Sequence, residues 1–172
     1  MQKKLLISCL FSCILYYTGF SQQAKVRLNH TAIYVTDLKA SVIFYKNVIG
    51  LDTIPEPFHD GKHAWLKTGP GTALHIVEGA EAKKEYYKNQ HTCFSVASVD
   101  NFILLLKILK INWEDRDGKK MAISTRPDGV KQIWLQDPDG YWIEINDAKD
   151  GLACLIFALL PKNRDCKKNL RS

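Results

Sequence analysis

A short phrase occurs twice in this chain, 61 residues apart. The first copy is LNHTAIYVTDL at residues 28–38, and the second is NQHTCFSVASVD at residues 89–100. Each copy contains His-Thr, then a run in which the side chains alternate in polarity, then a residue that can cap a helix. Such self-similarity indicates a duplicated supersecondary unit, so we expect two modules of the same design.

The first module is expected to form a strand, a helix and three further strands. Residues 30–35 alternate with period 2, Thr36 or Asp37 can cap a helix, and Gly50 can end it. Further strands are expected at 51–54, 63–68 and 72–77, with turns at Asp60-Gly61 and at Gly69-Pro70-Gly71.

The second module repeats this order. A strand is expected at 91–96, followed by a helix that Ser98 or Asp100 caps. Strands are then expected at 111–114, 121–125, 131–136 and 141–146, with Pro-Asp-Gly at 138–140 as the last turn. The predicted fold class is α+β, with two tandem βαβββ modules (about 26–79 and 88–147) in one domain of residues 24–148.

The positive charge of the chain lies at its two ends. The net charge is +6, yet residues 5–161 carry 17 basic and 17 acidic side chains. A basic groove along the folded body is therefore not expected, and we predict no nucleic-acid partner.

The two ends also differ from the body in hydrophobicity. MQKK, the apolar run LLISCLFSCILYY and the small or polar residues after it predict a signal peptide over residues 1–23, with an uncleaved anchor as the alternative. The protein is then expected to be exported, to a bacterial periplasm or beyond the cell. Residues 149–172 form an apolar and then basic C-terminal tail, interpreted as a short packed helix or as a weak membrane-surface contact.

Four ionisable residues fall at matching places in the two modules. His30 and His91 open the first strand of each module, and His75 and Glu144 lie on the last strand of each. Because neighbouring side chains of a strand point to opposite faces, all four are expected on the face away from the helices. Imidazoles with one carboxylate suit Zn, Fe, Ni, Co or Mn better than Ca or Mg, so one divalent transition metal is predicted.

Other ionisable side chains receive a structural interpretation. His59 and His63 flank a turn and are expected to be exposed to solvent. Asp137 and Asp139 belong to the last hairpin turn, where Asp is favoured for local hydrogen bonding.

Two long motifs resemble a known family. NHTAIYVTDLKASVIFYKNVIGL at 29–51 is similar to the opening module of the vicinal oxygen chelate superfamily, which includes glyoxalase I (lactoylglutathione lyase). IWLQDPDGYWIEIND at 133–147 is similar to its closing hairpin. The resemblance covers about residues 26–147 and implies a cupped, barrel-like mixed sheet with the helices outside, around a divalent metal.

Matched strand by strand, the ligand positions of that family fall on His30, His75, His91 and Glu144. Glyoxalase I commonly has a carboxylate at the end of its first module, where this chain has His75. Glu144 is thus the one obvious carboxylate, and whether His75 is a ligand or lies behind the ligands stays open. The resemblance also implies that a homodimer could join His30 and His75 of one chain to His91 and Glu144 of another.

Three classes of function follow from the resemblance. The first is a glyoxalase-like lyase or isomerase, in which a small substrate chelates the metal through vicinal oxygens and Glu144 moves a proton. The second is an Fe(II)-dependent extradiol-type dioxygenase that uses His30, His91 and Glu144 as ligands. The third is a protein that binds a small molecule such as an antibiotic and confers resistance.

Overall fold

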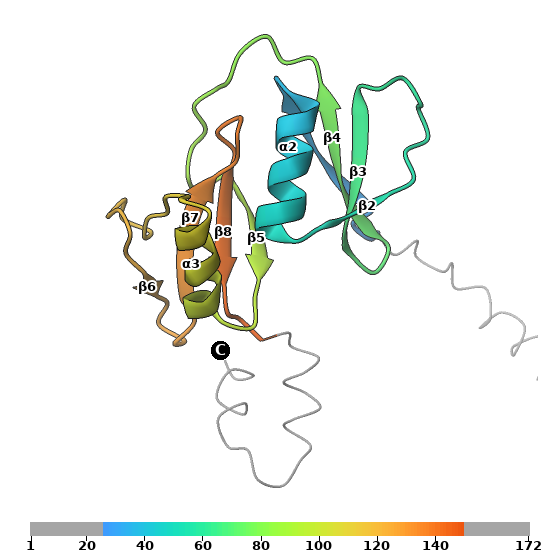
Figure 1. The fold of residues 1–172 in the computed structure, drawn as a ribbon. Helices are drawn as coiled ribbons and strands as arrows, with labels where there is room; N and C mark the ends of the chain where they lie inside the picture. The colour runs from blue at the N-terminus through green and yellow to red at the C-terminus, as the bar shows by residue number, and fades with distance from the viewer. Residues whose placement is uncertain (1–25, 150–172) are drawn as a thin grey trace, which may run out of the picture.

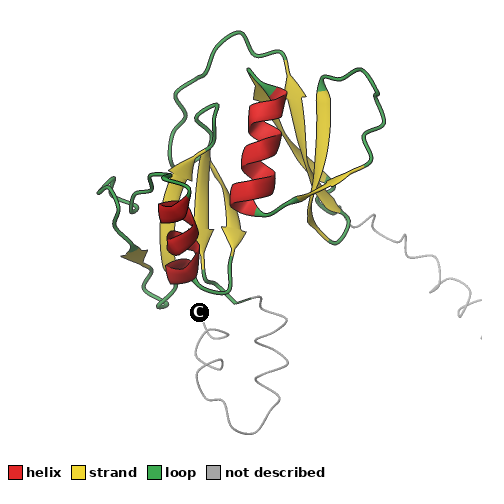
Figure 2. Ribbon diagram, in the orientation of Figure 1, coloured by secondary structure: helices red, strands yellow, loops and turns green. Residues whose placement is uncertain are grey.

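The computed structural model describes residues 26–149. The predicted signal peptide and nearly all of the C-terminal tail lie outside this range. Figures 1 and 2 show two four-stranded sheets, each with its own helix, joined by a long connection between β4 and β5. No helix formed by residues 26–149 is long and apolar enough to span a membrane.

The first module has the predicted βαβββ order. Its elements are β1 (His30–Val35), α2 (Leu38–Phe44), a single π-helical turn η1 (Tyr45–Ile49), β2 (Asp52–Ile54), β3 (His63–Gly69) and β4 (Thr72–Glu78). The Asp37 carboxylate accepts a 2.9 Å hydrogen bond from the Ala40 amide and caps α2 as expected. Gly50 ends the helical segment in the left-handed region, at φ 85°, a conformation that glycine adopts without steric cost.

The second module follows the same plan with a shorter outer strand. Its elements are β5 (His91–Ser95), α3 (Val99–Ile108), β6 (Ser124–Thr125), β7 (Lys131–Gln136) and β8 (Trp142–Asn146). The strand orders, β1-β4-β3-β2 and β5-β8-β7-β6, place equivalent strands at equivalent positions. The prediction of two similar α+β modules is confirmed.

The prediction of a strand at 111–114 is wrong. In this segment Glu114 forms only isolated bridges to Lys120 and Trp134. The Asp115 carboxylate accepts hydrogen bonds from the amides of Asp117 and Lys119, at 2.9 and 2.8 Å, and closes a local turn. Trp113 in this loop is buried, at 4% exposure, which explains why the sequence of the loop resembles that of a strand.

Each sheet packs one face against a helix and leaves the other face turned away from it; we call the latter the open face. In β1, Ile33 and Val35 are buried, while His30, Ala32 and Tyr34 on the open face are exposed. The predicted alternation is therefore confirmed. β1 and β5 are both edge strands, and among residues 26–149 no strand of one module pairs with a strand of the other.

The closing hairpin turn of the second module fastens the two modules together. The Asp139 carboxylate accepts hydrogen bonds from the Thr36 amide (2.8 Å), the Thr36 hydroxyl (2.7 Å) and the Ser41 hydroxyl (3.2 Å). The Tyr45 hydroxyl donates to Asp137 at 3.0 Å. These two aspartates therefore do more than shape their own turn, which is all that the sequence had indicated.

Burial changes the acid–base behaviour of these groups. It raises the pKa of the Tyr45 hydroxyl above its ordinary value, and the Asp137 carboxylate beside it acts in the same direction. Burial also raises the pKa of Asp137, although the hydrogen bonds that it accepts oppose this shift.

Candidate metal centre

His91 and Glu144 form a close pair on the open face of the second sheet. His91 Nε2 and Glu144 Oε2 are 3.0 Å apart, and the two side chains are 25% and 10% exposed. They come from neighbouring parallel strands, β5 and β8, in which Cys93 stands opposite Glu144. The sequence prediction that His91 and Glu144 share a face and point to one place is confirmed.

The hydrogen bonding of His91 leaves its second ring nitrogen available for a cation. His91 Nδ1 lies 2.9 Å from the carbonyl oxygen of Lys88, and a carbonyl only accepts, so the proton of a neutral ring is held on Nδ1. Nε2 then directs a lone pair at a carboxylate oxygen. Two lone pairs at this distance repel each other unless a proton or a metal ion lies between them. With metal–ligand bonds of about 2.0–2.2 Å, the two atoms are spaced as ligands of one ion.

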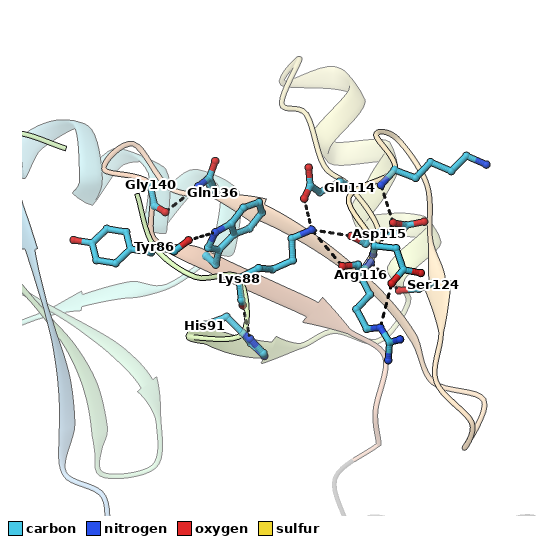
Figure 3. Close-up of polar contacts among 12 residues, drawn as sticks. Tyr86, Lys88, His91, Glu114, Asp115, Arg116, Ser124, Gln136 and Gly140 are labelled. Carbon is cyan, nitrogen blue, oxygen red and sulfur yellow. Dashed lines mark hydrogen bonds and ion pairs between the residues drawn. The ribbon is translucent and has the colours of Figure 1, made fainter. Parts of the chain in front are cut away.

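Lys88 holds the segment that carries this carbonyl. Its ammonium group forms an ion pair with Glu114 and hydrogen bonds to the carbonyl oxygens of Asp115 (3.2 Å) and Arg116 (3.4 Å), as Figure 3 shows. It also lies 4.9 Å from the ring centroid of Trp142. The carbonyl that orients His91 is thus anchored to the body of the second module.

The other oxygen of Glu144 is held by Asn146. The Asn146 amide nitrogen donates to Glu144 Oε1 at 2.9 Å and contacts Cys93 Sγ at 3.0 Å. Asn146 Oδ1 accepts from the Ser95 hydroxyl at 3.1 Å, which fixes the orientation of the amide. Burial, and then the Glu144 carboxylate, raise the pKa of the Cys93 thiol to about 12. Glu144 is therefore held at Oε1 and directs Oε2 at His91.

His30 repeats the arrangement of His91 in the first module. His30 Nδ1 lies 2.7 Å from Asn29 Oδ1, so a neutral ring carries its proton on Nδ1 and leaves Nε2 free. The ring centroid is 4.8 Å from that of Trp65 and 6.0 Å from that of His75. The prediction that His30 and His75 share the open face of the first sheet is confirmed.

His75 is held in a different way. Its Nε2 lies 2.8 Å from His63 Nδ1, and His63 Nε2 lies 3.4 Å from Asp60 Oδ2. His75 is 8% exposed, and burial, with His63 and His30 acting in the same direction, lowers the pKa of its ring. The expectation that His63 faces solvent is wrong, because β3 begins at His63 and turns the side chain onto the open face.

The four predicted ligands do not meet within one chain. Among residues 26–149, no group of three or more His, Cys, Asp or Glu side chains lies close enough to hold a metal ion. Each module instead presents half of the donor set, His30 and His75 on one open face and His91 and Glu144 on the other. The donor types fit a transition metal, but a complete centre needs both halves to face each other.

A pocket between the modules lies apart from these side chains. It encloses about 380 Å³ and includes Ile49, Leu51, Phe94 and Phe102 in its lining. Its lining contains none of the four predicted ligands, so the pocket does not complete the centre.

Comparisons with known proteins agree with the fold. The family model for the Glyoxalase/Bleomycin resistance protein/Dioxygenase superfamily matches residues 27–145. The lactoylglutathione lyase of Salmonella typhimurium is 30% identical over 133 residues, which cover 73% of this chain and 95% of that protein. The protein YwbC of Bacillus subtilis is 28% identical over 123 residues, covering 69% and 94% of the two chains.

A solved structure has the same fold. The oxidase ChaP-H1 superposes with a TM-score of 0.60 at 26% identity, over 73% of this chain and 98% of that one. The duplicated βαβββ module and the family match agree with each other. The chain belongs to the Glyoxalase/Bleomycin resistance protein/Dioxygenase superfamily, the group also called vicinal oxygen chelate proteins.

Proposed function

We propose that this protein is a divalent-metal-dependent lyase or isomerase of the glyoxalase type, acting on a small substrate that binds the metal through two neighbouring oxygens. The observation that carries the proposal is the contact between His91 Nε2 and Glu144 Oε2 at 3.0 Å. The other ring nitrogen of His91 and the other carboxylate oxygen of Glu144 are held by the Lys88 carbonyl and by Asn146. Such an arrangement is favourable when a cation binds between the two groups.

The centre forms between two chains in this proposal. His30, Ala32 and Tyr34 on β1 are exposed, and so are His91, Cys93 and Ser95 on β5. Both strands are at the edges of their sheets. A symmetric dimer places the first open face of each chain against the second open face of its partner, and it thereby builds two equal centres.

The chain's own residues have distinct roles in the reaction. His30, His75, His91 and Glu144 would hold the metal, which would supply Lewis-acid polarisation of two adjacent substrate oxygens. Asn146 holds Glu144 Oε1, so Oε2 is the atom that takes a proton from one substrate carbon and returns it to the next. Trp65, which is partly buried, and Trp134, which is buried, lie on the two open faces and limit the access of water to this space.

Metal content tests the first part of the proposal. The chain purified without added metal is expected to contain about one equivalent of Zn, Ni, Co, Mn or Fe per chain, measured by elemental analysis. A Glu144→Ala variant is expected to lose most of it, while Glu85→Ala, which changes an exposed carboxylate, keeps it. Wild-type protein that takes up none of these metals on titration contradicts the proposal and favours a metal-free binding protein.

Complementation tests whether the centre is shared between chains. A His30→Ala chain and a Glu144→Ala chain are each expected to be defective alone. When they are mixed and allowed to exchange, each heterodimer regains one intact centre, so about a quarter of the wild-type metal content is expected to return. If the centre forms within one chain, mixing restores nothing.

Activity then separates this proposal from its main alternative. The metal-loaded protein is expected to isomerise a hemithioacetal, and the metal-loaded Glu144→Gln variant is expected to lose this activity. An Fe(II)-dependent extradiol-type dioxygenase is the second candidate; in it His30, His91 and Glu144 would form a two-histidine, one-carboxylate set, and His75, engaged at Nε2 by His63, would not bind the metal. Oxygen uptake with Fe(II) and a catechol, without hemithioacetal turnover, selects that candidate.

A further inference from the structure

The three histidines of the candidate centre are not held alike. His30 and His91 each have Nδ1 against a protein oxygen, at 2.7 and 2.9 Å, and are free at Nε2. His75 is engaged at Nε2, which lies 2.8 Å from His63 Nδ1. If His75 contributes to the proposed centre, it therefore contributes through a different ring atom.

Asp60 determines the direction of the His63–His75 hydrogen bond. Its Oδ2 lies 3.4 Å from His63 Nε2, and a carboxylate at that distance stabilises a proton on the nitrogen that faces it. A neutral His63 with its proton on Nε2 has a lone pair on Nδ1. His75 must then be the donor of the bond, with its single proton on Nε2 and its Nδ1 bare.

Packing prevents the His75 ring from reversing this arrangement. The ring is stacked against Trp65, with centroids 4.3 Å apart and planes at 17°. Phe58 lies parallel to it within 3°, at 5.7 Å. A ring enclosed in this way cannot flip to exchange its nitrogens without opening the stack.

The bare nitrogen of His75 points away from His63. The two nitrogens of an imidazole point in different directions, so with Nε2 engaged by His63 the Nδ1 atom is directed elsewhere. β4 runs between β3, which carries His63, and β1, which carries His30. The ring of His30 is edge-on to that of His75, with centroids 6.0 Å apart.

We propose that His63 and Asp60 are positioning residues that fix His75 with its proton on Nε2, so that His75 acts at the centre through Nδ1. This inference rests on the proposed function only where it gives His75 a role at the metal centre. The tautomer itself is a property of the protein without metal. No catalytic role is assigned to His63 or Asp60, since both act through His75.

Nitrogen NMR of the ring atoms tests the tautomer directly in metal-free protein with ¹⁵N-labelled histidine, held at one pH near 8. Wild-type His75 is expected to show a protonated Nε2 and a bare Nδ1, the reverse of His30 and His91. His63→Phe keeps an aromatic ring at the position but removes the acceptor, and it is expected to give a mixture of His75 tautomers. His63→Gln returns an oxygen acceptor and is expected to restore the wild-type pattern.

Metal affinity supplies the second readout. Loss of such a partner typically weakens metal binding about 10- to 100-fold, so His63→Phe is expected to fall in that range. His63→Gln is expected to stay within about threefold of wild type. A His75 that carries its proton on Nδ1 in the wild type, or a His63→Phe variant with unchanged tautomer and affinity, overturns the inference. Wild-type protein that shows the expected tautomer but binds no metal instead overturns the proposed function.

Discussion

Asp139 offers the sharpest test of how the two modules are joined. Its carboxylate is 2% exposed and accepts from three donors on the first module, two of Thr36 and one of Ser41, which is fully buried. Replacement by Ala leaves the Ser41 hydroxyl buried without this acceptor, while half-buried Thr36 can turn to water in part. At about 1–3 kcal/mol for each buried group left unpaired, Asp139→Ala is expected to lower the free energy of unfolding by about 2–4 kcal/mol.

A second substitution separates hydrogen bonding from charge. Asp139→Asn keeps the Oδ1 acceptor for both Thr36 donors and directs an amide at the Ser41 hydroxyl, which can rotate to accept. Asp139→Asn is expected to lower the free energy of unfolding by about 1 kcal/mol or less. Both changes are to be measured by urea unfolding at neutral pH. The slope of the unfolding free energy against urea concentration is checked, and it should be the same for the two variants.

The chain contains a matched control for this experiment. Asp128 lies in a second Pro-Asp-Gly turn, where its carboxylate is 35% exposed and pairs with Arg126 at 2.6 Å. A surface ion pair contributes about 0–1 kcal/mol, so Asp128→Ala is expected to cost no more than that. If Asp139→Ala and Asp128→Ala lower the free energy of unfolding by equal amounts, the view that Asp139 joins the modules is refuted.

Three further predictions concern neighbouring groups. Tyr45→Phe removes the hydroxyl that donates to Asp137 at 3.0 Å and is expected to cost about 1–3 kcal/mol in urea unfolding. Lys88→Met frees the segment whose carbonyl orients His91 and is expected to weaken metal binding at least about tenfold by titration. Because burial lowers the pKa of His75, the unfolded state binds its proton more readily; metal-free protein is expected to lose stability as pH falls below about 6.5, and His75→Phe to lose less.

Specific outcomes contradict each of these three. A Tyr45→Phe variant as stable as wild type shows that Asp137 does not need this donor. Lys84→Met, at an exposed position, is the control for Lys88→Met, and equal affinities in the two variants remove the role given to Lys88. A stability that is constant between pH 7.5 and 5.5, or that falls equally in His75→Phe, shows that His75 does not carry the pH dependence.

The difference between His75 and the other histidines bears on the choice of reaction. A carboxylate at this position can bind a metal or move a proton with either oxygen, whereas His75 has one nitrogen engaged by His63. With His75 and Glu144 at the two equivalent positions, this chain does not have the pair of carboxylates that could move a proton on both sides of the substrate. In the proposed reaction Glu144 is left as the principal proton carrier, and hemithioacetal turnover measured beside oxygen uptake with a catechol separates the lyase from the oxygenase.

The sequence alone predicted the features that depend on interactions between residues close together in the chain. Alternation with period 2 follows from the geometry of one strand, so it correctly placed His30, His75, His91 and Glu144 on the faces away from the helices. Caps act within one helical turn, and Asp37 and Ser98 were identified for that reason. The doubled phrase revealed the two modules because duplicated segments keep the same local design.

The tertiary structure decided whatever depends on contacts between distant segments. The sequence placed His63 beside a turn, at the start of a strand, and predicted an exposed side chain, but the register of β3 and β4 brings it to His75, and no local pattern contains that register. Asp137 and Asp139 were assigned to their own turn, yet their partners lie about a hundred residues earlier in the chain. The sequence thus determined which residues could serve as ligands. Only the folded chain showed that each module carries half of them, because the separation of the two open faces is fixed by contacts between modules and not within either one.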